Sequence, residues 1–460
     1  MKFYDIINIF FKKLQSTEVE TVVIKEKQCP HCVNRGMFIF DSTPKSKNKK
    51  SVQMNFINNL LKSFIVSFLL LSFTYPQSDF VSVKGKEIIN PDGKPLLLKG
   101  INLGNWLNPE GYMFRFEDVN SFRLIDNVIK ELIGADETRK FWQTFRDNYI
   151  TKADIRFIKS TGLNHVRIPF NFKLFLVEDH PEIWLEEGFK RLDDVINWCD
   201  KENLYVVLDL HAAPGGQTGD NIDDSWGYPF LFEDEQAQQT TVTLWKKLAD
   251  RYKNEKIIVG YDLLNEPLPH YLDNKEELNQ LLEPLYKRIT EAIRVVDKNH
   301  IIFIGGAQWN TNFKMFGNPF DKKLVYTFHK YWMPPVQEQV QDYVDFSNKY
   351  DVPIWLGESG ENEDAWIDSF RVLLEENNFG WCFWPYKKMD SNRGMVQFPK
   401  TREWEEIIKY AETPKRNFED IRKTKPNKQI IKKALSDLLE NIKFQNCTIN
   451  EGYLNALGVK

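Results

Sequence analysis

The sequence predicts an α/β protein with a single closed barrel of eight parallel strands, preceded by a β-hairpin and followed by a helical extension. Eight short apolar runs, rich in β-branched and aromatic residues, follow one another between residues 96 and 387. Longer amphipathic segments separate them, and such crossovers imply a parallel sheet closed into a (β/α)₈, or TIM, barrel. No glycine-rich phosphate-binding loop follows the first run, which disfavours an open doubly wound sheet.

The strand predictions begin with a hairpin. Residues 80–100, FVSVKGKEIINPDGKPLLLKG, contain two strand-like runs joined by the turn signal Pro91-Asp92-Gly93. The eight barrel strands are then expected at 96–104, 164–170, 205–211, 258–267, 301–306, 324–332, 353–360 and 380–387.

Helical spacing of apolar residues marks the segments between strands, for example 185–203 and 276–299. Pro284 is expected to kink the second of these helices or to shift its start. Two long connections, 105–151 and 212–235, follow strands, so they belong to the barrel face where loops shape a site. The barrel domain is predicted to span 79–412. A charged linker and a helical tail of uncertain docking are predicted over 413–460.

Charge and composition narrow the classes of function. The chain has 61 basic and 65 acidic residues and a net charge of −4, which offers no field for nucleic acid or an anionic membrane. A neutral substrate fits better. Aromatic residues make up 14% of the chain, with 13 Trp, and flat aromatic faces suit stacking on sugar rings.

Cysteines are sparse and predict neither a disulfide framework nor a metal site. The five cysteines are spread along the chain, and the motif CPHC at 29–32 has no second ligand pair at zinc spacing. We therefore expect no metal and no organic cofactor.

The N-terminal region carries a targeting pattern. Residues 54–78 begin with Met54, followed by Lys62 and an apolar run from Ser63 to Phe73, which has the length of a signal-peptide core. Residues 1–53 show no such pattern, so we expect Met54 to be the true start and 1–53 an upstream extension. The protein is then exported, to the outside, the periplasm or the cell surface, without stable membrane insertion. An internal helix or a membrane anchor is the alternative.

Polar residues stand at the predicted carboxyl ends of the strands, and in a barrel these ends converge on one pocket. The set contains two carboxylates, a guanidinium, two imidazoles, an amide, a phenol and an indole. It comprises Arg167, His211, Asn265, Glu266, His329, Tyr331, Glu358 and Trp384. The two histidines lack a clear third ligand, so this set does not indicate zinc.

The two glutamates fit the chemistry of glycoside cleavage. That reaction needs one protonated carboxyl to donate to the leaving oxygen and one ionised carboxylate nearby. Glu266 follows the fourth predicted strand and Glu358 lies in the seventh. Closure of the barrel would bring them across the same pocket.

From about residue 80 to 412 the chain resembles glycoside hydrolase family 5, whose members are retaining (β/α)₈ glycosidases. The motifs that carry the resemblance are VRIPF, DLHAAPG, LLNEP, HKYW, GESG and FWPYK. The resemblance implies Glu266 as acid/base and Glu358 as nucleophile. It also implies that Asn265 holds the sugar 2-hydroxyl, that Arg167 and Tyr331 contact the nucleophile, and that His211, His329 and Trp384 line the same subsite.

Within the family, KGINLGNWLNPEG and DLHAAPGGQTGDN look most like exo-acting β-1,3-glucanases, whereas WPYKKMDSNRGMV looks more like bacterial relatives. The expected function is hydrolysis of a β-glucan, with β-1,3-glucan favoured. The alternatives are β-1,4-glucan, β-mannan or a glucosyl conjugate, a catalytically silent carbohydrate-binding barrel, or a metal-dependent barrel hydrolase.

Other residues near the predicted site divide between binding and structure. Trp106, Trp226, Trp309 and Trp332 are possible outer subsites, with core packing as the alternative. Glu361 and Glu363 are expected to lie in a solvated loop.

Overall fold

The computed structural model describes residues 79–460, which belong to one compact unit. The predicted extension at 1–53, the signal peptide at 54–78 and the CPHC motif lie outside the described residues. Within 79–460, no helix is both long enough and apolar enough to cross a membrane.

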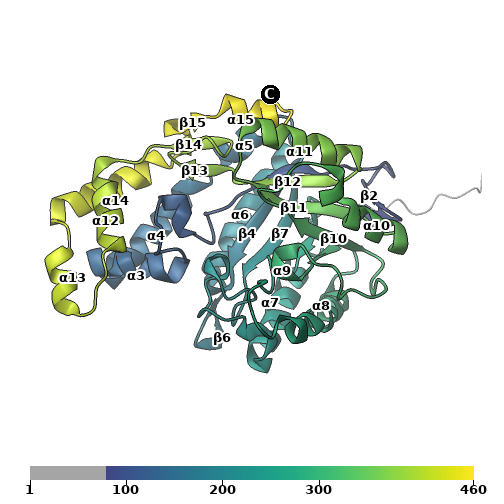
Figure 1. Ribbon diagram of the computed structural model, residues 1–460, viewed down its shortest axis with the longest axis horizontal. Coiled ribbons are helices and arrows are strands. Elements are labelled where there is room, and N and C mark those ends of the chain that lie inside the picture. Colours follow the sequence, from purple (N-terminus) through teal and green to yellow (C-terminus); the bar gives the residue numbers. More distant parts are fainter. Residues whose placement is uncertain (1–78) are drawn as a thin grey trace, which may run out of the picture. The chain divides into compact units, whose positions relative to one another are not determined.

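Eight parallel strands close into a barrel, as predicted, with the last strand paired to the first (Figure 1). In order they are β3 (Lys99–Asn102), β4 (His165–Asn171), β7 (Tyr205–Ala212), β8 (Ile258–Asp262), β9 (Ile301–Gly305), β10 (Leu324–His329), β11 (Ile354–Gly360) and β12 (Gly380–Trp384). Six of the eight predicted runs contain one of these strands, and the other two, 164–170 and 205–211, stop one residue before the strand ends.

Successive side chains of each strand point alternately into the barrel interior and toward the surrounding helices. In β7, Val207 joins an apolar cluster with Val259 and Val325 from other strands, whereas Val206 and Leu208 belong to the larger core. Each such buried aliphatic side chain stabilises the fold by about 1.5–3 kcal/mol. Asp209 and His211 point to the same side of the strand as Val207, into the barrel. The apolar interior therefore gives way to a polar pocket toward the carboxyl end of the strand.

Helices cover the barrel strands. They are α5 (Lys152–Ser160), α6 (Glu186–Glu202), α7 (Glu235–Tyr252), α8 (Lys275–Val296), α10 (Gln341–Tyr350) and α11 (Asp364–Glu376), with the short α9 (Ala307–Asn310) after β9. Both helices predicted from periodicity are present. Pro284 lies inside α8, so the predicted shift of the helix start is wrong.

The N-terminal hairpin is present, and the predicted turn lies between two paired runs. Gly93 N–H donates to the Asn90 carbonyl at 2.9 Å, Ile89 and Pro95 form an antiparallel bridge, and Leu96 N–H donates to the Ile88 carbonyl at 2.7 Å. The first run also folds back on itself, because β1 (Ser82–Lys84) and β2 (Glu87–Ile89) pair antiparallel across Gly85, whose φ of +57° suits glycine. The prediction missed this inner turn because it treated β1 and β2 as one run.

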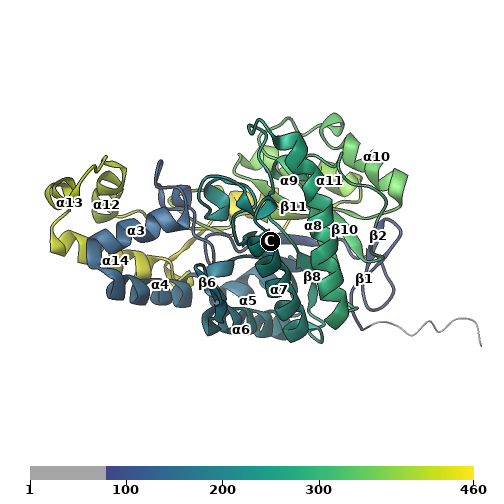
Figure 2. The ribbon, with the colours of Figure 1, turned by 90° about the horizontal axis from the view of Figure 1, so that it is seen from below.

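The connection 105–151 contains η1 (Gly111–Phe114), α3 (Phe122–Ile133) and α4 (Ala135–Tyr149). These helices lie beside α12 (Arg402–Glu412), α13 (Phe418–Thr424) and α14 (Lys428–Asn441), as both views show (Figures 1 and 2). α14 buries Ile431, Ala434, Leu435 and Leu438. The predicted tail helix is therefore docked on the layer formed by the long first connection.

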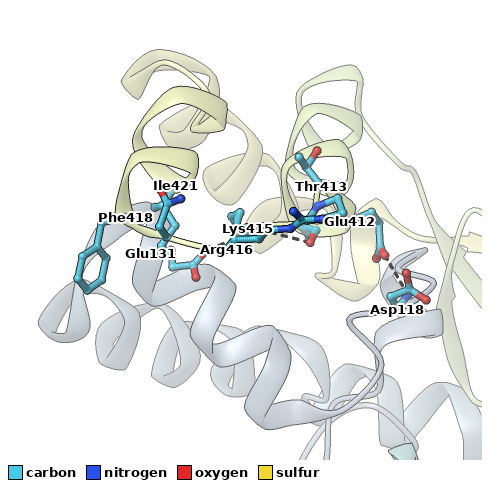
Figure 3. A pocket seen from close by; sticks show the side chains of 11 residues that line it. Asp118, Glu131, Glu412, Thr413, Lys415, Arg416, Phe418 and Ile421 are labelled. Carbon is cyan, nitrogen blue, oxygen red and sulfur yellow. Dashed lines mark hydrogen bonds and ion pairs between the residues drawn. The ribbon is translucent and has the colours of Figure 1, made fainter.

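A surface hollow of about 680 Å³ lies between α3 and residues 411–421 (Figure 3). At its edge, Glu412 accepts the backbone N–H groups of Glu117 and Asp118 at 3.0 and 2.9 Å. Lys415 Nζ lies 3.7 Å from Glu131 Oε2 across the hollow. These contacts join the C-terminal extension to the loop before α3.

A second sheet ties the end of the chain to the barrel. It contains β13 (Lys387–Met389), β14 (Val396–Phe398) and β15 (Thr448–Ile449), and α15 (Glu451–Ala456) follows and packs on α11. The fully buried Lys387 contacts Asp154 at 2.8 Å and donates to the Ile442 carbonyl at 2.8 Å. A small hairpin, β5 (Leu176–Val177) and β6 (His180–Trp184), stands after β4, and the remaining 3₁₀ turns are η2 (Phe172–Leu174), η3 (Asn221–Asp223), η4 (Phe230–Phe232), η5 (Gln337–Gln339) and η6 (Phe444–Asn446).

Candidate active site

The structure brings the two predicted glutamates together at the carboxyl end of the barrel. One carboxylate oxygen of Glu266 and one of Glu358 lie within 4.8 Å of each other and of a ring nitrogen of His329. Both side chains are nearly buried, with Glu266 9% and Glu358 6% exposed. Two carboxyl groups this close in a buried pocket cannot both ionise freely.

Glu266 stands in a strained backbone conformation beyond the end of β8. Its φ is +46°, which is costly for a residue with a side chain. The loop after β7 holds it there. Thr218 donates its hydroxyl to the Glu266 carbonyl at 2.6 Å, and Gln217 donates to the Asn265 carbonyl at 2.8 Å. The long 212–235 connection therefore positions the first glutamate.

Arg167 is fully buried and binds the carboxylates around it. Its guanidinium contacts Asp262 at 2.9 Å, Asp209 at 3.0 Å and Glu358 at 3.2 Å. It also donates to Asn265 Oδ1 at 2.9 Å. Sequence reasoning placed Arg167 at a strand end. It is instead the third residue of β4, and its length carries the guanidinium up into the pocket.

Glu358 is held by two donors, as the resemblance implied. Tyr331 donates its hydroxyl to Oε1 at 2.7 Å, and Arg167 Nη1 donates to Oε2 at 3.2 Å. Burial raises the pKa of Glu358, while Arg167, His211 and Tyr331 act in the opposite direction.

Glu266 has one close ionisable neighbour that is neutral. Burial raises the pKa of Glu266 well above its ordinary value, and repulsion from Glu358 raises it further. His329 Nδ1 lies 2.8 Å from Glu266 Oε1. Burial holds the pKa of His329 well below its usual range, with Arg167 adding to the effect, so the ring is neutral near pH 7. Glu266 is therefore the better proton donor of the two glutamates.

His211 behaves differently from His329. Burial lowers its pKa, but Asp209 at 2.8 Å and Glu110 at 3.5 Å outweigh burial and raise it to about 10. His211 is therefore an imidazolium held between two carboxylates. Its ring lies parallel to that of Trp384, with centroids 5.6 Å apart, and it approaches Asn265 Nδ2 at 3.4 Å.

Trp384 lies at the end of β12 and is 2% exposed. Its indole N–H donates to the Tyr112 hydroxyl at 2.5 Å, and the following peptide bond to Pro385 is cis. Gly104 lies against the ring, because a Cβ there would fall 2.3 Å from the indole.

Replacing Gly104 with alanine is expected to displace Trp384 without unfolding the barrel. A Cβ cannot coexist with the indole at 2.3 Å, so the ring must rotate and lose its bond to Tyr112. We expect a loss of about 1–3 kcal/mol in the free energy of unfolding, measured by urea titration. Gly93, beside which a Cβ meets nothing within 4 Å, has a positive φ of its own and is not a matched control. The control is Gly317→Ala, where the nearest atom is 3.7 Å away. Equal free energies of unfolding for Gly104→Ala and Gly317→Ala would contradict the close packing of Gly104 against Trp384.

The outer tryptophans separate into core and surface. Trp106 is buried and donates to the Arg146 carbonyl, so it is core. Trp226 and Trp332 are 69% and 73% exposed, and Trp309 is half-buried. For these three, contact with a ligand stays a prediction.

The expectation of a solvated loop after Glu358 is wrong for Glu361. Lys388 Nζ lies 2.7 Å from both carboxylate oxygens of Glu361, and both side chains are buried. Glu361 also has a φ of +51°, which turns it inward. Glu363 is exposed, as expected.

Glu266, His329 and Glu358 have the composition of a three-ligand metal site, but their hydrogen bonds do not fit that use. Both nitrogens of His329 are engaged, Nδ1 by Glu266 at 2.8 Å and Nε2 by Asn310 at 3.1 Å. A metal would have to break one of these bonds. The arrangement suits transfer of protons between carboxyls and substrate better.

Sequence reasoning missed several polar residues that support the site, namely Asn102, Glu110, Asp209, Asp262 and Asn310. Asp209 was accessible to it, because strand residues two apart share a face and His211 had been chosen. Asp262 ends β8 and contacts Arg167, but the predicted strand ran on to residue 267, so Asp262 was not read as a strand end. Glu110 comes from a loop and Asn310 ends the short, irregular α9, and neither has a periodic signal.

Comparison with known proteins identifies the class. The family model described as Cellulase (glycosyl hydrolase family 5) matches residues 126–390, more than half of the chain. The chain belongs to glycoside hydrolase family 5 and is a glycosyl hydrolase.

Among its relatives, a β-xylosidase of Phanerodontia chrysosporium is 30% identical over 69% of this chain and 72% of its own length. Endoglucanase C of Acetivibrio thermocellus is 28% identical over 53% of this chain and 86% of its own. A probable glucan 1,3-β-glucosidase A of Aspergillus clavatus is 28% identical over 57% and 64%. A crystal structure of an endogalactoceramidase shares the fold, with a TM-score of 0.52 and 19% identity over 67% of this chain and 75% of its own.

Proposed function

We propose that the protein is a retaining β-glycosidase that cleaves a β-glucan, with Glu266 as acid/base and Glu358 as nucleophile. The observation that carries this proposal is the spacing of the two carboxyls, which have oxygens within 4.8 Å. Retaining glycosidases place their carboxyls about 5–5.5 Å apart, whereas inverting enzymes need about 6.5–9.5 Å to admit a water.

In the first step, Glu358 attacks the anomeric carbon while Glu266 gives its proton to the glycosidic oxygen, and the bond between that carbon and oxygen breaks. The leaving sugar departs with the proton, and the remaining sugar is an ester of Glu358. In the second step, Glu266 takes a proton from water, whose oxygen attacks the anomeric carbon and releases Glu358.

The surroundings of each glutamate support these roles. Arg167 and Tyr331 stabilise the ionised form of Glu358, which keeps it nucleophilic. Within residues 79–460, Glu266 has no cation at contact distance, and its raised pKa keeps it protonated. Once Glu358 is an ester its charge is gone, so the pKa of Glu266 falls and it can act as base.

Asn265, His211, His329 and Trp384 are proposed to hold the sugar at the cleavage point. Asn265 lies beside Glu266 with its amide nitrogen 3.4 Å from His211, so it can turn that donor toward a sugar hydroxyl. Trp384 is proposed as the platform beneath the sugar, and its ring lies parallel to that of His211 in the same pocket.

A β-glucan is favoured because relatives named endoglucanase and glucan 1,3-β-glucosidase match 53% and 57% of this chain. β-1,3-Glucan remains the preferred linkage on the motifs described above. Another family 5 specificity is the second candidate. The observation that favours it is the similarity to a β-xylosidase, which extends over more of this chain.

Export also remains part of the proposal. It rests on the apolar segment 54–78 alone, and N-terminal sequencing of the natively produced protein tests it. A mature start near Asp79 supports export, and a start at Met1 overturns it.

The pH dependence of kcat/KM should be bell-shaped, with both limbs above the ordinary range of glutamate. Glu358 must be ionised, so activity is lost as pH falls through its raised pKa, and Glu266 must be protonated, so activity is lost as pH rises through its own. In Tyr331→Phe, Glu358 loses a donor and its pKa rises, so the acid limb should move to higher pH. An acid limb that stays in place would contradict this assignment.

The experiment is release of reducing sugar from β-1,3-glucan, mixed-linkage β-glucan, a cellulose derivative and mannan by residues 79–460. Glu358→Gln is the matched control. Activity on one polymer that this variant abolishes supports both the class and the nucleophile. If the folded protein leaves every polymer intact, hydrolysis of these polysaccharides is excluded, and small glycosides and glycan binding become the test of the remaining candidates.

A further inference from the structure

Residues 308–310, between β9 and Thr311, form a turn with an unusual backbone. Gln308, Trp309 and Asn310 have φ values of +50°, +56° and +60°, three consecutive left-handed residues with side chains. L-residues rarely adopt this conformation even singly, and strain of this kind concentrates at functional sites. We therefore ask which side chain this turn positions.

The surrounding structure holds the turn rigidly. Ala307 and Asn312 exchange backbone hydrogen bonds of 3.0 and 2.9 Å across it. On its outer side, Gln308 donates to Asn279 Oδ1 at 2.8 Å and accepts from Asn312 Nδ2 at 2.6 Å. Such a frame can maintain an unfavourable conformation.

The inner side of the turn carries Asn310, which is fully buried. Its side chain lies over Gly305, where a Cβ would fall 2.0 Å from Asn310 Oδ1, so this packing requires glycine. Asn310 Nδ2 lies 3.1 Å from His329 Nε2. Among the residues the structure describes, Oδ1 has no hydrogen-bond partner, so the bond to His329 is the one polar contact that the side chain makes.

With the amide nitrogen of Asn310 facing Nε2, this contact assigns the proton of His329. An amide nitrogen only donates, so Nε2 must accept, and in a neutral ring the proton is then on Nδ1. Nδ1–H donates to Glu266 Oε1, 2.8 Å away. A protonated Glu266 that accepts at Oε1 carries its own proton on Oε2.

We propose that Asn310 is a positioning residue that, through the tautomer of His329, keeps the catalytic proton of Glu266 on Oε2. This inference rests on the proposed role of Glu266 as general acid. Without Asn310, His329 is free to carry its proton on Nε2, and Glu266 then donates to His329 instead of to the leaving group.

Other groups also act on Glu266 and are unchanged by a substitution at 310. Those that face it across the pocket are Glu110, Arg167, His211, Tyr331 and Glu358. A change specific to Asn310 must therefore appear as poorer proton donation, with the nucleophile unaffected.

The test compares Asn310→Asp and Asn310→Ala with wild type on two aryl β-glycosides of the sugar that the protein cleaves. A phenyl leaving group needs a proton, whereas 2,4-dinitrophenolate leaves without one. We expect kcat/KM for the phenyl glycoside to fall by about tenfold or more, within the range that general acid catalysis contributes. With the dinitrophenyl glycoside it should change less than about twofold. Lys314→Ala, at an exposed position outside the turn, is the control and should change neither.

Nitrogen-15 NMR of the histidines gives a readout independent of turnover. Wild type should show a buried neutral histidine protonated on Nδ1, and this signal should change in Asn310→Asp, whose carboxylate accepts from Nε2–H. Equal losses on both glycosides, no loss on either, or an unchanged tautomer would overturn the inference. If this tautomer is present in wild type but Glu266→Gln loses as much activity on the dinitrophenyl glycoside as on the phenyl glycoside, the role of Glu266 as general acid fails although the contact between Asn310 and His329 stands.

Discussion

Replacing Glu358 with glutamine is expected to lower kcat by at least about 10⁴-fold on any substrate that the wild type cleaves. The amide has nearly the same shape but cannot attack an anomeric carbon, so the glycosyl ester cannot form. Tyr331 and Arg167 should keep the side chain in place, because the amide oxygen can still accept one of their hydrogen bonds. The measurement is initial-rate kinetics with far-UV circular dichroism as a check of folding.

Glu363→Gln is the control, since it removes a carboxylate from the same loop at an exposed position. It should retain wild-type activity. A Glu358→Gln variant that is folded and retains more than about a hundredth of the wild-type rate would show that another group attacks the sugar.

Replacing Arg167 with methionine is expected to lower the free energy of unfolding by about 3–5 kcal/mol, the range for removing one partner of a buried charge cluster. Asp209 and Asp262 are fully buried and lie 3.0 and 2.9 Å from the guanidinium. Methionine fills much of the same volume, so the loss reports charge left without a partner rather than a cavity.

The matched control is Arg156→Met, which breaks an ion pair with Glu202 at 3.1 Å on the surface, where the arginine side chain is 60% exposed. Exposed pairs of this kind contribute about 0–1 kcal/mol. Urea denaturation of both variants at pH 7 measures the difference. Losses of the same size would mean that Arg167 is not essential to the charge balance of the barrel interior.

The eight strands were predictable because a parallel strand buried on both faces leaves a short continuous apolar run, and helical crossovers must separate such runs. Glu266 and Glu358 were predictable for the same reason, since a carboxylate beside such a run is costly unless it is used. Local signals of this kind require no knowledge of what lies across the barrel.

What could not be predicted depends on contacts between distant segments. Glu361 looks like a loop residue until Lys388, 27 positions later, is placed against it. Asn310 has no periodic signal, and its role depends on three left-handed residues that no local preference favours. The docking of α14 depends on α4, which lies almost 300 positions earlier and whose Asn148 donates to the Leu439 carbonyl.

The anomeric configuration of the first product tests the central claim most directly. Proton NMR during the first minutes of cleavage of a β-glycoside distinguishes the two anomers before they interconvert. Two successive displacements at the anomeric carbon, with an ester of Glu358 between them, require that the sugar be released first as the β-anomer. Release first as the α-anomer would show a single displacement by water and would contradict the assignment of Glu358 as nucleophile.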